Sequence, residues 1–239
     1  MNAHSRFDVQ FVSLGPGHPD LITLAARKAL LQCDHIYYPV TVSPSGKKTS
    51  RAEEIILAHD IDTTKLRPYT LPMNKDRSEA MRAYEDVATQ CLADYREGLS
   101  VVVAAEGDAG FYSSTHYISD ALLSKGCPFR YIPGVPAFIA GGAHAGLSIT
   151  RLDEELQIIP GNATTEKLGD AMTEGRKVLI MKLSRCEKVV KDFLAMNKDV
   201  AAVYFENVGT PDEFISTGIE EDILPRPFPY FSMMWLRPK

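Results

Sequence analysis

The sequence has few of the residues that build disulfide frameworks or zinc ribbons. Its 239 residues include four cysteines, which stand far apart and form no Cys-x-x-Cys pair: Cys33, Cys91, Cys127 and Cys186. This spacing is typical of neither a dense disulfide scaffold nor a structural zinc site. Reduced thiols in a cytoplasmic protein are therefore expected.

Long apolar runs are also missing. No stretch of about 18 apolar residues occurs, which predicts that the chain does not span a membrane. The N-terminal residues MNAHSRFDVQF contain no apolar segment followed by small residues, so secretion is not indicated.

A basic surplus is absent as well, since the net charge is −5. This removes the usual electrostatic reason to expect a nucleic-acid partner. An anionic small-molecule substrate remains compatible with this charge, provided that a local basic cluster binds it.

What is present is an alternation of apolar runs with helical patterns in the first half of the chain. The apolar share of 45% is that of a globular protein. The alternation predicts a parallel, doubly wound sheet of five strands. The expected strands are 7–14, 34–38, 66–71, 99–105 and 129–132, and the expected helices are 19–33, 51–59, 78–98 and 113–125.

The rhythm changes after about residue 142. Five further strands are expected, with only two clear helices among them: 156–160, 177–183, 200–206, 213–217 and 229–236. We therefore predict an N-terminal parallel α/β domain over 1–142 and a C-terminal mixed α/β domain over 143–239.

The first loop with chemical interest is Gly15-Pro16-Gly17, which follows the first expected strand. Glycines allow a sharp turn and a close approach of the backbone to a ligand. The turn alone is equally compatible with an ordinary strand-to-helix connection. A dinucleotide site is disfavoured because Gly-x-Gly-x-x-Gly is missing and because Pro16 and Pro19 lack amide protons.

Two further loops follow later strands. Glu106-Gly107-Asp108-Ala109-Gly110 follows the fourth strand, and Pro133-Gly134 follows the fifth. An acidic residue at such a position can accept hydrogen bonds from ribose hydroxyls or an amino group, or it can cap backbone amides. In open α/β sheets, ligands bind outside the carboxyl ends of the strands.

Taken together and in this order, the three loops resemble those of the tetrapyrrole (corrin/porphyrin) methylase family. Within that family, four segments are most similar to members that methylate the C20 carbon of precorrin-2 or cobalt-precorrin-2: Tyr37-Tyr38-Pro39, Gly46…Ser50…Ala52, Tyr112-Ser113-Ser114 and Pro229-Tyr230-Phe231-Ser232. Two positions depart from the family pattern. His18 replaces the usual Asp after the first loop, and Ala109 replaces the usual Pro after Gly-Asp.

The resemblance implies two αβα domains with the active site in the cleft between them. It also implies S-adenosylmethionine (SAM) as methyl donor, which leaves as S-adenosylhomocysteine, and a homodimer. The implied cofactor residues are Pro16, Gly107, Asp108, Phe111, Ser113, Ala137, Phe138, Met181 and Val208. Without the resemblance, Met181 would be read as a core methionine.

Lys47, Lys48 and Arg51 form a basic stretch that could pair with the carboxylates of a tetrapyrrole, or could simply be a solvated loop. Three residues are candidates for the base that removes the C20 proton: Glu106, Tyr112 and His116. His144 is interpreted equally well as a histidine on a helix surface. No Ser-His-Asp arrangement or metal-ligand spacing is recognised, so no metal is expected. The alternatives are another methylase of the same fold, including uroporphyrinogen, diphthamide and ribosomal RNA relatives, and a non-catalytic ligand-binding protein.

Overall fold

The computed structural model describes residues 9–43, 45–72 and 77–239. The chain divides into two compact units, Met1–Pro136 and Ala137–Lys239. The sequence analysis places the division a few residues later, after residue 142.

The N-terminal unit contains the five parallel strands that the sequence predicts, in the spatial order β4-β2-β5-β1-β6. Every residue of β5 is buried, as expected for the central strand of a parallel sheet. Phe7 and Asp8, and with them most of the segment expected to lack a secretion signal, lie outside the described residues. The strands are β1 (Val9–Ser13), β2 (His35–Val42), β4 (Leu66–Pro72), β5 (Val101–Ala105) and β6 (Phe129–Ile132).

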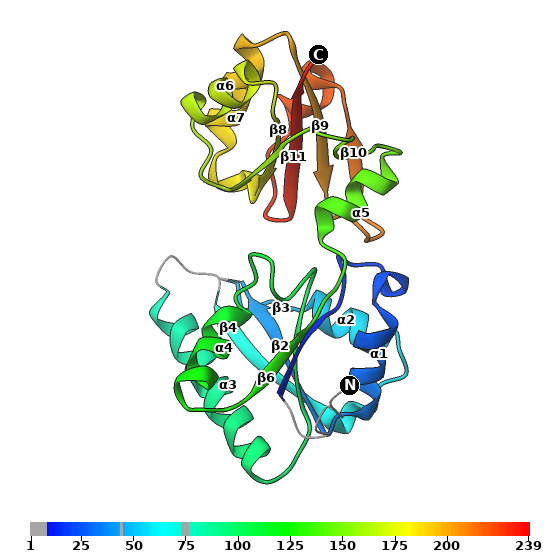
Figure 1. Ribbon diagram of the computed structural model, residues 1–239, viewed down its shortest axis with the longest axis vertical. Coiled ribbons are helices and arrows are strands. Elements are labelled where there is room, and N and C mark those ends of the chain that lie inside the picture. The colour runs from blue at the N-terminus through cyan, green and yellow to red at the C-terminus, as the bar shows by residue number, and fades with distance from the viewer. Residues whose placement is uncertain (1–8, 44, 73–76) are drawn as a thin grey trace. The chain divides into compact units, whose positions relative to one another are not determined.

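Helices cover both faces of this sheet (Figure 1). Residues of α1 (Leu24–Gln32) and α2 (Arg51–Leu57) form one apolar core with one face, whereas α3 (Ser78–Arg96) and α4 (Thr115–Ser124) form a second core with the other. The doubly wound architecture is thereby confirmed.

The helix expected over 19–33 is wrong in its first part. Residues Pro19–Leu21 form a separate 3-10 helix, and α1 begins only at Leu24. The cause is Thr23, whose side chain accepts a hydrogen bond from the backbone N–H of Ala26 and so caps a new helix.

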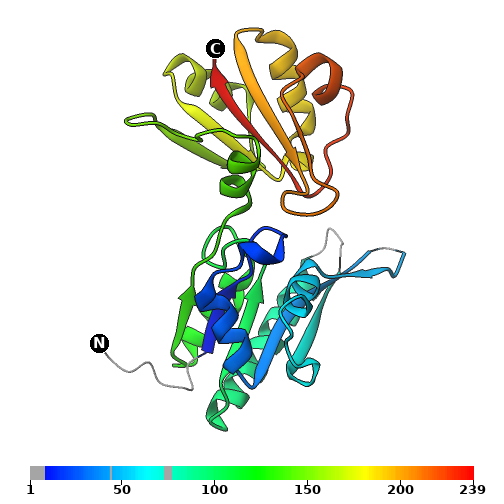
Figure 2. The same cartoon turned by 90° about the vertical axis from the view of Figure 1, so that its right-hand side faces the viewer.

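The basic segment after β2 is not a plain loop. Lys48–Thr49 form a short strand, β3, that pairs antiparallel with the end of β2. The turn between them is closed by a hydrogen bond from the N–H of Ser43 to the carbonyl oxygen of Lys47, and Gly46 takes a positive φ of 82°. Figure 2 shows this hairpin extending outward from the N-terminal unit. A 3-10 helix, Thr63–Lys65, precedes β4.

The C-terminal unit has the mixed five-stranded sheet that the sequence predicts, in the order β10-β9-β11-β8-β7. Only β7 and β8 are parallel neighbours. The last strand begins at Ser232, three residues later than expected, and a π-helix (Ile219–Ile223) was not expected. The strands are β7 (Leu156–Pro160), β8 (Lys177–Met181), β9 (Val200–Glu206), β10 (Phe214–Ser216) and β11 (Ser232–Pro238).

In this unit, α6 (Thr165–Thr173) and α7 (Glu187–Met196) lie on one face of the sheet and α5 (Ala137–His144) on the other (Figure 1). The first two helices share the main apolar core of the unit, with Leu168, Val190 and Tyr204 fully buried in it. A 3-10 turn, Leu183–Arg185, follows β8.

Candidate active site

The glycine loops that follow β1 and β5 are joined by their backbones. The N–H of Gly15 donates to the carbonyl oxygen of Gly107 at 3.1 Å, and the N–H of Gly107 donates to that of Gly15 at 2.7 Å. Gly15 has a φ of 81°, and a Cβ there would lie 2.8 Å from the carbonyl oxygen of Leu21. Only glycine therefore fits this crossing without strain.

Ser13, the last residue of β1, also joins the first loop to the second. Its side chain is fully buried, and its hydroxyl accepts a hydrogen bond from the N–H of Ala109 at 2.8 Å. Ser13 is not among the predicted site residues. The available signal was a polar residue at the last position of a strand whose five residues are all buried.

Asp108 links the second loop to the third. One carboxylate oxygen accepts from the N–H of Gly134 at 2.8 Å, and the other accepts from the N–H of Gly110 at 2.9 Å. A Cβ on Gly134 would lie 2.4 Å from the Cβ of Ser13, so the third loop packs directly on the first. The three loops thus form one structure at the carboxyl edge of the sheet.

The cofactor residues predicted in this unit lie in these loops. Pro16 is buried in the first, and Gly107 has a positive φ of 66° with open space where a Cβ would be. Phe111 is half-buried and makes an edge contact with Tyr112, 4.8 Å between ring centroids. The Ser113 hydroxyl accepts from that of Thr115 at 3.0 Å. Ser114, at the N-cap position of α4, makes no side-chain capping bond.

Glu106, at the exit of β5, is the candidate base whose environment is most altered. Burial raises the pKa of its half-buried carboxyl, and the nearby Arg51 guanidinium acts in the opposite direction. Arg51 is the first residue of α2, so a predicted substrate residue lies close to a predicted base. Lys47 and Lys48 are exposed on the hairpin of β2 and β3.

The other two candidate bases are more exposed. Tyr112 lies in a left-handed backbone conformation with φ 50°. The Nδ1–H of His116 donates to the carbonyl oxygen of Ser113 at 2.8 Å, and its ring contacts that of Tyr117. His18, whose role the sequence left open, caps the first 3-10 helix by accepting from the N–H of Asp20 at 3.2 Å.

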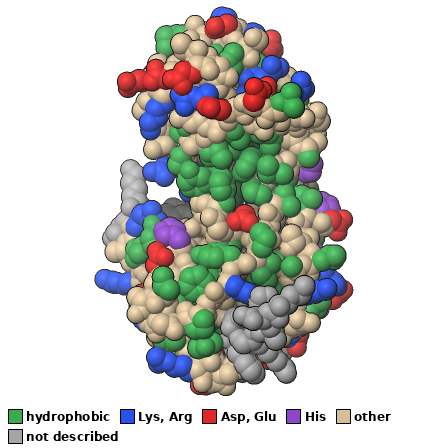
Figure 3. All heavy atoms as spheres, in the orientation of Figure 1, with side chains coloured by type: hydrophobic (Ala, Val, Ile, Leu, Met, Phe, Trp, Pro, Cys, Tyr) green, Lys and Arg blue, Asp and Glu red, His purple; other side chains and the backbone are tan. Residues whose placement is uncertain are grey.

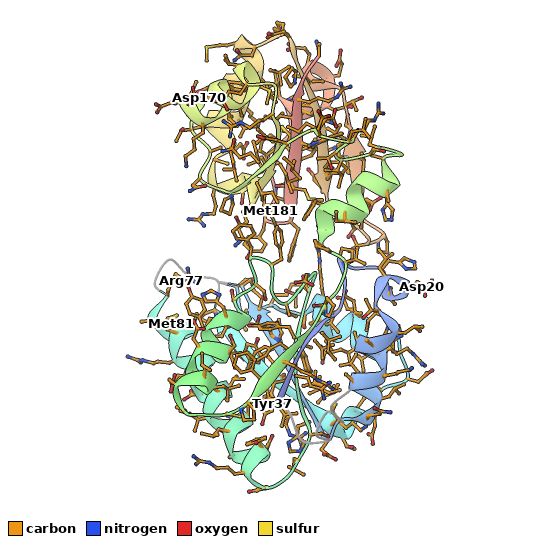
Figure 4. All side chains as sticks on the ribbon, viewed as in Figure 1. Asp20, Tyr37, Arg77, Met81, Asp170 and Met181 are labelled. Atoms are coloured by element: carbon orange, nitrogen blue, oxygen red, sulfur yellow. The ribbon has the colours of Figure 1, made fainter. Side chains whose placement is uncertain are left out.

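In the C-terminal unit, Met181 is the last residue of β8 (Figure 4). It is half-buried and lies opposite Met233 of β11, which is in register with Phe205 of β9. A Cβ on Gly141 of α5 would lie 3.0 Å from Phe205 and 3.1 Å from Met233, so α5 packs on this face. Met181 belongs to the same face and lies outside the main core of the unit.

The remaining predicted residues of this unit lie close to strand ends or to α5. Ala137 and Phe138 open α5, and Val208 is buried just after β9. His144, at the end of α5, pairs with Glu213 at 2.8 Å, and Glu213 also accepts from the N–H of Gly209. This histidine therefore links the end of α5 to the loop after β9.

The described residues contain neither a metal-binding cluster nor a membrane-spanning helix. Among them, no group of three or more His, Cys, Asp or Glu side chains is arranged to hold a metal ion. In residues 9–43, 45–72 and 77–239, no helix has the length and apolar character needed to cross a membrane.

The fold and the loops define a class: a two-domain α/β protein with a ligand site built from glycine-rich loops at the carboxyl edge of a parallel sheet. Residues 8–223 match the model of the tetrapyrrole (corrin/porphyrin) methylases, and the chain belongs to this family. The expected methyl donor, SAM, is confirmed with the family.

Two relatives and one solved structure illustrate the likeness. The chain is 29% identical over 228 residues to a precorrin-2 C(20)-methyltransferase of Sinorhizobium sp, covering 93% of this chain and 92% of the relative. It is 27% identical over 226 residues to a cobalt-precorrin-2 C(20)-methyltransferase of Salmonella typhimurium, covering 92% of each. The structure of a cobalt precorrin-4 methyltransferase matches its fold with a TM-score of 0.72 at 23% identity, over 98% of this chain and 95% of the other.

Proposed function

We propose that this protein transfers a methyl group from SAM to C20 of precorrin-2 or cobalt-precorrin-2, a step of cobalamin biosynthesis. Two full-length relatives with this activity in their names support the proposal, as do the four segments singled out in the sequence. The structural observation that carries it is the union of the three loops at one edge of the sheet, which provides a rigid ligand site.

The loops fit the requirements of SAM. An ionised carboxylate accepts about four hydrogen bonds, and the backbone uses one on each oxygen of Asp108, so the remaining positions can accept from hydroxyls or an amine. Gly107 leaves open space on the same loop. We assign Pro16, Gly107, Asp108, Phe111 and Ser113 to SAM; Ala137, Phe138, Met181 and Val208 stay predictions for the C-terminal unit.

SAM itself supplies an electrophilic methyl group, so the protein needs no nucleophile of its own. Its residues orient the reactants and exclude water. After the methyl group bonds to C20, the hydrogen on that carbon must leave as a proton.

We assign this proton to Glu106. A carboxylate whose pKa is raised is a better proton acceptor than an ordinary one. His116 and Tyr112 are both exposed, whereas Glu106 is half-buried, which makes Glu106 the stronger candidate. Lys47, Lys48 and Arg51 are assigned to carboxylates of the substrate.

A single-turnover incubation with SAM and precorrin-2, with and without cobalt, tests the proposal. The mass of the product should rise by one methyl group with at least one of the two substrates. No increase with either substrate, despite SAM binding, would favour a non-catalytic ligand-binding protein.

The second candidate is another methylase of the same fold, acting on uroporphyrinogen-III or on a different precorrin position. The fold match to a cobalt precorrin-4 methyltransferase favours this alternative. We expect a homodimer, and sedimentation measures this oligomeric state. We also expect a cytoplasmic location and neither a nucleic-acid nor a membrane partner.

A further inference from the structure

A stack of aromatic rings lies between α3 and α4. Tyr117 of α4 stacks on Tyr84 of α3 with ring centroids 5.3 Å apart, and Tyr84 meets Tyr69 of β4 edge-on at 6.3 Å. Tyr84 is buried, so the stack is anchored in the core of the N-terminal unit. Tyr117 is therefore a rigid support for whatever contacts it.

Two basic side chains rest on Tyr117. The guanidinium carbon of Arg77 lies 5.5 Å from the ring centroid, and its Nη2 donates to the Tyr117 hydroxyl at 3.2 Å. The His116 ring lies 3.9 Å from the same ring, between centroids. Because its Nδ1–H donates to Ser113, the Nε2 of His116 is left for another partner.

In the described part of the chain, neither of these two side chains takes part in an ion pair. Arg77 keeps guanidinium donors beyond the one that Tyr117 occupies. In Figure 3 a histidine on this part of the N-terminal unit lies next to both Lys or Arg and Asp or Glu side chains, and Figure 4 shows Arg77 at the start of α3. The ring of Tyr117 thus contacts both a guanidinium group and an imidazole ring.

The pair lies at the same edge of the sheet as the glycine loops. Arg77 precedes α3, which follows β4, and His116 lies in the first turn of α4, which follows β5. Both helices cover one face of the sheet, whereas Arg51 begins α2 on the opposite face. Basic groups therefore flank the carboxyl edge from both helical layers.

We propose that Arg77 and His116 form a second subsite for a carboxylate of the substrate, separate from Lys47, Lys48 and Arg51. This inference rests on the proposed function, because it takes a polycarboxylate tetrapyrrole as the ligand. Guanidinium binds carboxylate in bidentate fashion, and a carboxylate beside His116 favours the protonated ring, whose Nε2 then donates as well. The Tyr117 support lowers the entropy cost of holding Arg77 in place.

The test uses sirohydrochlorin, a stable tetrapyrrole that carries carboxylate side chains like those of precorrin-2, with the full-length protein. Its dissociation constant is measured for wild type, Arg77→Gln, Arg77→Lys and His116→Gln. Arg96→Gln is the matched control, since it removes the same charge at the other end of α3, about 28 Å away for a helix of 19 residues. Calorimetry with S-adenosylhomocysteine and thermal melting confirm that each variant is folded.

We expect Arg77→Gln to weaken sirohydrochlorin binding about tenfold, His116→Gln by a smaller factor, and Arg77→Lys to recover part of the loss. Every variant should bind S-adenosylhomocysteine as wild type does, and Arg96→Gln should also bind sirohydrochlorin as wild type does. In turnover, Arg77→Gln should raise the KM and keep kcat. Binding by Arg77→Gln within twofold of wild type overturns the subsite, and so does a wild type that binds no sirohydrochlorin. A wild type that binds it but methylates no precorrin overturns the proposed function alone.

Discussion

The carboxylate of Asp108 accepts a hydrogen bond from the backbone N–H of Gly134 at 2.8 Å, across 26 residues of sequence. Its second oxygen binds the N–H of Gly110, in its own loop. The residue expected to contact SAM therefore also holds the ligand-binding loops together. Its two roles can be separated by experiment.

Asp108→Asn tests both roles. The amide NH2 would face one of the two backbone N–H groups, so one hydrogen bond is lost, either to the exposed Gly110 or to the half-buried Gly134. We expect the free energy of unfolding to fall by about 1–3 kcal/mol and affinity for S-adenosylhomocysteine to fall at least tenfold. Urea denaturation and calorimetry measure the two effects. Lower stability with unchanged affinity would leave Asp108 a purely structural role.

Gly134→Ala tests the packing of the third loop on the first. The new Cβ would lie 2.4 Å from the Cβ of Ser13 and 2.9 Å from the carbonyl oxygen of Gly107, so the loops must separate. We expect a loss of about 2 kcal/mol or more in stability and weaker SAM binding. Gly169→Ala is the control, because Gly169 lies within α6 with nothing near its Cβ position; it should stabilise by about 0.5–1 kcal/mol. Equal stability of the two variants would contradict the close approach of the loops.

Glu106→Gln removes the proposed proton acceptor while keeping the shape of the side chain. In single-turnover experiments the variant should lose the rise in rate that accompanies ionisation of the carboxyl, and its rate should fall by about 10²-fold or more. A rate and pH profile equal to those of wild type would move the base to Tyr112 or His116.

The same variant has a predicted effect on stability. Burial raises the pKa of Glu106 above its ordinary value of 4.5, so the folded protein holds this proton more tightly than the unfolded chain does. The stability of wild type relative to Glu106→Gln is therefore highest below pH 4.5. This relative stability falls as the pH rises from 4.5 through the raised pKa. Urea melts at several pH values detect this, with exposed Glu97→Gln as control. A pH-independent difference would contradict the raised pKa.

A partly buried polar network at the other end of the N-terminal sheet stabilises this unit. Asp94 of α3 accepts from the Tyr37 hydroxyl at 2.8 Å and pairs with His35 at 2.6 Å, and His35 contacts Arg67. Figure 4 shows Tyr37 within this unit. Asp94→Ala should cost about 2–3 kcal/mol, because it leaves buried donors unpaired.

The control for Asp94→Ala is Asp86→Ala, because Asp86 is an exposed aspartate on the same helix. It should change the free energy of unfolding by less than about 0.5 kcal/mol. The affinity for S-adenosylhomocysteine should stay the same in both variants, since the network lies away from the loops. Equal stability of the two variants would show that Asp94 is not part of a cooperative network.

Much of the fold follows from local patterns. The all-buried run Val101–Ala105 and the glycine at Gly98 after α3 could be read directly, because burial on both faces and helix termination leave clear signals. The break between Leu21 and Leu24 could not be predicted, because the composition there suits a 3-10 helix and an α-helix equally. The break depends on the hydrogen bond that the Thr23 side chain accepts from the N–H of Ala26.

Less of the candidate site than of the fold could be predicted from the sequence. Its loops could be located from glycine positions and family likeness, whereas their mutual contacts depend on pairs distant in sequence, such as Gly15 with Gly107 and Ser13 with Gly134. The pairing of Lys48 with Val42 was equally hidden, because a two-residue strand carries no periodicity.

The central claim is methyl transfer to one particular carbon. The most direct measurement is a turnover with SAM labelled with ¹³C in its methyl group and precorrin-2, with and without cobalt, followed by NMR assignment of the labelled product. The account predicts one new methyl group bonded to C20. A label on C2, C7 or any other ring carbon would contradict it.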